Sequence, residues 1–251
     1  MGHLFEIILF QPIFNGFVAL YNVLPDVGLV ILIITVIIKV VLYPLTTASI
    51  KAQKSLTELQ PKLEELKQKH KGNQQEIAQE TMKLYKEHKV NPLGSCLPIL
   101  IQLPIFLALY FVFRDALANS RFELLYSFVT KPEYINSVTL QLFDLGKPNV
   151  VLAVLAGGAQ FFQAKMFIRK NPPKQSGTDG KNENMMSIMN KQMLYLMPIM
   201  TLLIGLQLPG GLSLYWFLST ILTFLQQHIV FRQTKNDSGT PSDVLEGTLV
   251  K

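Results

Sequence analysis

The residue most out of keeping with its surroundings is Lys39, which lies inside the apolar run from Val27 to Leu42. An ammonium group in the middle of a membrane helix costs on the order of 3 kcal/mol. A lysine can extend its charged end toward the membrane surface, but the expected helix end is about 12 Å away, farther than the side chain covers. We therefore expect Lys39 either to extend as far as it can or to face water or a polar partner within the membrane.

Glutamines fall at a similar depth in other apolar segments. Counted at about 1.5 Å per residue, each lies roughly 8–12 Å from one end of its segment, and these ends share one side of the membrane. They are Gln102, Gln160, Gln163 and Gln226. Gathered with Lys39 around one cavity they hydrate one another, whereas each facing lipid would cost free energy. We predict a water-filled pocket open on that side. The alternative is glutamine hydrogen bonding between tightly packed helices.

The composition sets the class of protein that must position these side chains. The 251 residues are 49% hydrophobic and only 16% charged, with a mean hydropathy of +0.29. Such a chain is an all-α polytopic membrane protein. Five spans are expected, with a tight turn at Pro209-Gly210-Gly211 between the last two. They cover residues 27–47, 97–113, 150–168, 193–208 and 212–231, within a core over 25–233.

The remaining segments flank this core. Residues 1–24 lack a basic start, so a cleaved signal peptide is not expected, and they predict an amphipathic helix on the membrane surface, or else an extra span. Residues 51–90 predict a helical hairpin, whose first arm carries leucines at helical spacing. These are Leu56, Leu59, Leu63 and Leu66. Residues 234–251 are expected to be disordered.

The distribution of Lys and Arg predicts the direction of the chain across the membrane. Their numbers are 0 in 1–26, 9 in 51–94, 3 in 118–149, 5 in 169–191 and 3 in 232–251. Basic residues concentrate in cytoplasmic loops, so the N-terminus is expected outside and the C-terminus, like the hairpin, in the cytoplasm.

A methionine stripe leads into the fourth span. It consists of Met186, Met189, Met193, Met197 and Met200, which share one helix face. Methionine is flexible and polarizable, so such a face can accept many apolar partners, although ordinary core packing explains it as well.

Other functions find less support. A small-ion or solute transporter using Lys39 is the alternative, but no internal repeat and no acidic residue within a span accompany it. The single cysteine, Cys96, excludes an internal disulfide and a cysteine zinc cluster. The four histidines are dispersed and no catalytic or nucleotide-binding motif occurs, so we expect neither an enzyme nor a cofactor.

Several motifs resemble those of one known family. Tyr43-Pro44-Leu45-Thr46 follows the first span, and Asn91-Pro92-Leu93-Gly94-Ser95-Cys96 leads into Gln102-Leu103-Pro104-Ile105-Phe106. Leu208-Pro209-Gly210-Gly211-Leu212 precedes Tyr215-Trp216. In order and in loop length, residues 5–233 look like the YidC-type membrane protein insertases, which include the mitochondrial oxidase-assembly and chloroplast Albino proteins.

The resemblance implies a five-helix insertase core in the bacterial plasma membrane, with a hydrophilic groove open to the cytoplasm and to lipid. Such proteins insert and fold nascent membrane proteins, alone or with the Sec translocon, without nucleotide. Lys39 matches the positive groove residue, usually arginine, and Gln102, Gln160, Gln163 and Trp216 match groove-lining positions. The methionine stripe matches the surface along which substrate helices leave. Loops 51–94 and 169–191 are candidate ribosome contacts, and nothing demands more than a monomer.

Overall fold

The computed structural model describes residues 2–70, 72–91, 94, 97–168 and 192–237, of which 98–99, 167–168 and 234–237 by backbone alone. The elements are α1 (His3–Phe5), η1 (Glu6–Phe10), α2 (Gln11–Val23), α3 (Val27–Val41), α4 (Tyr43–Lys69), α5 (Gln74–Glu87), α6 (Leu97–Leu117), η3 (Phe122–Leu124), β1 (Val138–Thr139), β2 (Phe143–Asp144), α7 (Val150–Ile168), η4 (Gln192–Leu196), α9 (Met197–Gly205) and α10 (Gly210–Asp237). The two short strands form an antiparallel hairpin. The predicted all-α class is confirmed.

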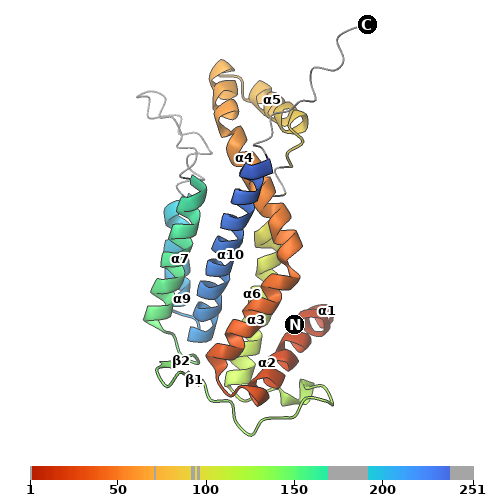
Figure 1. Cartoon of the computed structure of the whole chain (residues 1–251), viewed down its shortest axis with the longest axis vertical. Helices are drawn as coiled ribbons and strands as arrows, with labels where there is room; N and C mark the ends of the chain where they lie inside the picture. The colour runs from red at the N-terminus through yellow and green to blue at the C-terminus, as the bar shows by residue number, and fades with distance from the viewer. Residues whose placement is uncertain (1, 71, 92–93, 95–96, 169–191, 238–251) are drawn as a thin grey trace.

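The long helices form an elongated bundle with two distinct ends (Figure 1). At the hairpin end, α4 and α5 project beyond the bundle. At the loop end lie β1, β2 and the connection between α6 and α7. Helix α10 lies between α7 and α3, and it contacts both.

Within the described residues, three helical segments are long and apolar enough to cross a membrane: His3–Val23, Leu100–Leu117 and Gly210–Gln233. The bent pair α3–α4 adds a fourth. Val150–Met166 and Gln192–Gly205 are shorter apolar helices. The last is about 21 Å long, against a hydrocarbon thickness of about 30 Å.

The first expected span, 27–47, differs from the structure because the helix breaks at Leu42. Asp26 caps the start of α3 by accepting a hydrogen bond from the Leu29 amide at 3.0 Å. Helix α3 ends at Val41, and α4 continues at an angle of 67°. Pro44 explains the break, because it has no amide hydrogen for the carbonyl of Val40 and disfavours helical geometry at the preceding residue.

The turn between α9 and α10 requires glycine for close packing. The Gly210 amide donates to the Lys147 carbonyl at 2.9 Å, and a Cβ on Gly210 would lie 3.0 Å from that same oxygen.

The last helix starts two residues earlier than expected and continues to Asp237, into the segment 234–251 for which disorder was predicted. The rest of that segment lies outside the described residues.

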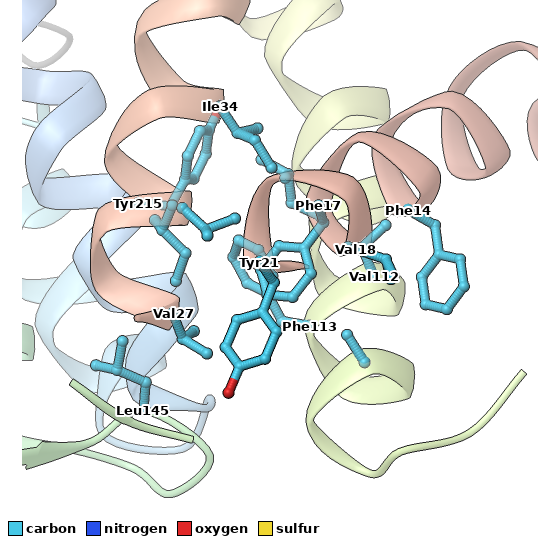
Figure 2. Close-up of a cluster of buried hydrophobic side chains, with 14 of the residues drawn as sticks. Phe14, Phe17, Val18, Tyr21, Val27, Ile34, Val112, Phe113, Leu145 and Tyr215 are labelled. Carbon is cyan, nitrogen blue, oxygen red and sulfur yellow. The ribbon is translucent and has the colours of Figure 1, made fainter. Parts of the chain in front are cut away.

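The main hydrophobic core occupies the loop-end part of the bundle, where side chains from α2, α3, α6 and α10 meet (Figure 2). Phe14, Phe17, Phe113 and Tyr215 are almost completely buried there. The N-terminal segment therefore packs on the bundle through one face, while Leu4, Ile7 and Ile8 on α1 and η1 are exposed. Whether this segment lies on the membrane or crosses it stays a prediction.

The hairpin is less tightly packed than the core. Leu59 and Leu63 of α4 are buried, whereas α5 buries none of its residues. Lys62 Nζ lies 2.8 Å from His88 Nε2, which joins the two arms by a polar contact. The hairpin thus consists of a long arm continuous with the bundle and a loosely attached second arm.

Candidate functional site

Lys39 lies two residues before the end of α3 and is half-buried against α10. Its Nζ donates a hydrogen bond to Thr223 Oγ1 at 2.8 Å, and Thr223 in turn donates to the Ser219 carbonyl at 2.7 Å. In the described part of the chain, no ion pair includes Lys39. An ammonium group has three donors, so two of them are available to a further partner.

Gln226 lies about one helical turn beyond Thr223 on α10, and its exposed fraction is 6%. Its Nε2, which carries two hydrogens, lies within hydrogen-bond distance of three acceptors: the Tyr43 carbonyl at 3.1 Å, Thr46 Oγ1 at 2.8 Å and Thr47 Oγ1 at 2.9 Å. Its amide therefore ties α10 to the first turn of α4, directly after the bend. This contact resembles the packed-helix alternative more than an open groove wall.

Gln102 of α6 and Trp216 of α10 each take part in a contact between these two helices, toward the loop end of α10. Gln102 Nε2 donates to the Tyr215 hydroxyl at 2.7 Å, which joins α6 to α10. The Trp216 ring packs edge-on against Phe106, with 5.2 Å between the ring centroids. Trp216 and Thr223 are two turns apart, about 10 Å at ~1.5 Å per residue. Lys39, Gln226, Gln102 and Trp216 thus follow one side of α10.

Gln160 belongs to a different interface. Its Oε1 accepts a hydrogen bond from Thr201 Oγ1, which joins α7 to α9. The two helices approach closely here, since a Cβ on Gly157 would lie 3.0 Å from the Pro198 carbonyl. Gln163, one turn along α7, is half-buried. The structure therefore divides the predicted glutamine layer between the α10 contacts and the α7–α9 contact.

The methionine stripe is only partly described. Met193 is half-buried, and Met197 and Met200 are 43% and 45% exposed. Met186 and Met189 lie outside the described residues. The methionines of α9 therefore present an apolar surface outward instead of filling the core.

The partners of the polar residues escaped the sequence analysis. They are the hydroxyls of Thr223, Tyr215, Thr201, Thr46 and Thr47. A signal existed in α10, where Ser213, Ser219, Thr220 and Thr223 recur in an otherwise apolar segment. Among the described residues, no group of three His, Cys, Asp or Glu could hold a metal ion.

Together, these features define a polytopic helical membrane protein with a lysine and several amides between its helices and a hairpin projecting from one end. Comparison with known proteins assigns this class to a family. Residues 19–237 match the model of the family described as "60Kd inner membrane protein". The chain belongs to this YidC family of bacterial multi-pass membrane protein insertases, which are not enzymes, and the predicted membership is confirmed.

The relatives differ in length. The chain is 36% identical to the membrane protein insertase YidC of Fusobacterium nucleatum, with 82% of this chain and 86% of that protein covered. It is 34% identical to the YidC of Actinobacillus succinogenes, where the match covers 88% of this chain and 36% of the relative. A solved structure described as an active YidC insertase with its first transmembrane domain resolved matches with a TM-score of 0.55. That match has 26% identity and covers 86% of this chain and 45% of the other.

Proposed function

We propose that this insertase takes short-tailed nascent membrane proteins into a hydrophilic groove open to the cytoplasm and releases their helices sideways into lipid. Lys39 carries the proposal. It is a half-buried cation in an apolar helix, its partner Thr223 is a neutral hydroxyl, and no ion pair of the described residues includes it. A charge kept in such a position at a cost is a candidate binding site for an acidic segment.

In the proposed orientation, the hairpin end is cytoplasmic and the loop end is outside. The segment that contains the hairpin, 51–94, carries 9 Lys and Arg, against 3 in 118–149. This asymmetry agrees with the general enrichment of basic residues in cytoplasmic loops. An acidic substrate tail would then approach Lys39 from the cytoplasm, with Gln102 and Trp216 deeper along α10.

The release of the substrate helix is proposed to follow α9. Met197 and Met200 face outward, and methionine accommodates apolar side chains of different shapes. The short segment Gln192–Gly205 favours local thinning of the bilayer, which shortens the polar tail's path. Burial of the substrate helix then supplies about 0.8 kcal/mol per CH₂ group.

The partners beyond substrates and lipid belong to the same proposal. We expect the protein to work as a monomer, alone or beside the Sec translocon. The basic segment 51–94 is available for phosphate contacts with a ribosome. The second basic segment, 169–191, lies outside the described residues.

The deciding experiment is protease protection of an acidic-tailed single-span substrate, synthesised in the presence of proteoliposomes that contain only this protein. A protected fragment above the level of empty liposomes is expected. No gain over empty liposomes would contradict insertion by this protein alone. A solute flux through the same liposomes would then favour the transporter alternative.

A further inference from the structure

The tip of the β1–β2 hairpin has an unusual backbone for its sequence. Thr139 and Leu142 close a two-residue turn through a hydrogen bond of 3.0 Å from the Leu142 amide to the Thr139 carbonyl. The two central residues, Leu140 and Gln141, have φ values of 50° and 57°. Such turns favour Asn and Gly, because a positive φ brings the Cβ of other residues into steric conflict. Turn geometry alone therefore does not explain the leucine.

The surrounding structure holds this strained turn in place. Asp26, the cap of α3, accepts hydrogen bonds from Thr139 Oγ1 at 2.5 Å and from the Leu140 amide at 3.0 Å. Thr139 is buried against the first turn of α3, where a Cβ on Gly28 would lie 2.3 Å from its hydroxyl. Backbone strain that several contacts hold in place makes a position a candidate for a functional role, and here that position is Leu140.

These contacts also fix the depth of the tip. Because Asp26 caps α3, the turn lies level with the start of a helix that enters the membrane. Helix α7 begins nearby in the sequence with Val150 and Val151, which are 64% and 54% exposed, and we expect these valines to face lipid. Leu140 and Leu142 are themselves 66% and 75% exposed, at the boundary where the spans begin.

We propose that this hairpin tip is a lipid anchor, in which Leu140 and Leu142 enter the interfacial layer of the bilayer at the loop end. Exposed leucines at this depth bury apolar surface by contacting acyl chains. The side chain of Lys147 is 81% exposed beyond the end of β2 and lies 3.3 Å from Asp144 Oδ2, so we expect this charged pair to mark the water beside the tip. The tip is held at the level where α3 begins, and this depth favours lipid over a protein partner as its occupant.

Spin labels in proteoliposomes of the full chain test this placement. In a Cys96→Ser background, single cysteines replace Leu140 or Leu142 and carry a nitroxide. The accessibility of the label to oxygen, which partitions into lipid, is compared with its accessibility to a nickel chelate, which stays in water. Val151→Cys serves as the lipid reference and Lys147→Cys as the aqueous reference. With the chelate on both sides, the result does not depend on the orientation of the protein.

At both tip positions we expect a ratio of oxygen to nickel accessibility close to that at position 151 and well above that at position 147. A ratio equal to that at 147 would overturn the proposal, because the tip would then face water. Low accessibility to both reagents would also overturn it, because the tip would then be covered by protein. Two labelled positions guard against a variant that disturbs the turn.

Discussion

The charge of Lys39 should determine how well the protein inserts acidic tails. Its Nζ holds one neutral partner, Thr223 Oγ1 at 2.8 Å, and is half-buried. At an effective dielectric constant of about 20, a substrate carboxylate about 4 Å away gains about 4 kcal/mol of Coulomb energy. Loss of water from both charges offsets part of this gain. A net effect of about 1.4–2.8 kcal/mol corresponds to about 10- to 100-fold in the binding of the tail.

The assay compares Lys39→Met, which removes the charge, with Lys39→Arg, which retains it. Both are reconstituted alone, and protease protection is measured for two substrates that differ only by Asp or Asn in the tail. With Lys39→Met, at substrate levels below saturation, we expect about a 10- to 100-fold loss for the Asp tail and little change for the Asn tail. Lys39→Arg should insert both. Equal losses for the two tails would refute a charge-based role, as would no loss for the Asp tail.

Three further predictions concern contacts around the site and the loop end. Gln226→Met should lower the free energy of unfolding by about 2 kcal/mol, at about 0.6 kcal/mol per interhelical hydrogen bond. Thermal unfolding in detergent measures this loss. Gln227→Met is the control, because the buried Gln227 Oε1 has no hydrogen-bond partner among the described residues. Burial alone would raise the pKa of Asp26, but hydrogen bonds from Thr139 and backbone amides lower it overall. The stabilisation that the ionised Asp26 gives the folded protein is therefore full above the unfolded pKa of about 4 and is lost as the pH falls through the lower folded pKa. Hydrogen exchange at the β1–β2 hairpin should detect this loss. Asp26→Asn should remove the pH dependence. Finally, Gln102→Cys in the Cys96→Ser background should react with a water-soluble maleimide only from the hairpin side, and an inert thiol would favour packed helices.

A depth for each polar residue follows from the sequence and stays a prediction, whereas the neighbours of these residues could not be predicted. A fixed rise per residue gives the expected depth, and the distribution of Lys and Arg gives the expected side of the membrane. The direction in which a side chain points around its helix can be predicted only where the helix has an apolar and a polar face. Helices such as α7 are apolar nearly all round. Gln160 therefore fell in the predicted layer yet contacts Thr201 on α9, away from Lys39.

The helix break at Leu42 had a signal in the sequence, because Pro44 is a helix breaker outside the first turn of a helix. Hydropathy nevertheless continued through it, and so one span over 27–47 was expected. The pairing of Lys39 with Thr223 was not predictable in this way, since the two residues are 184 positions apart and only the packing of α3 against α10 joins them.

The break gives the hairpin a mechanical connection to the membrane part of the molecule. Helix α4 extends over 27 residues with Pro61 inside it, about 40 Å at ~1.5 Å per residue. The Gln226 amide holds the inner end of α4 beside the bend at Leu42, and this bend lies three residues beyond Lys39. At this length, a small rotation of α4 about its inner end would move the outer end by several ångströms. A load on the hairpin would therefore reach the bundle through the inner part of α4, where the hydrogen bonds of Gln226 and the packing of Ile50 against Val230 and Phe231 hold the helix.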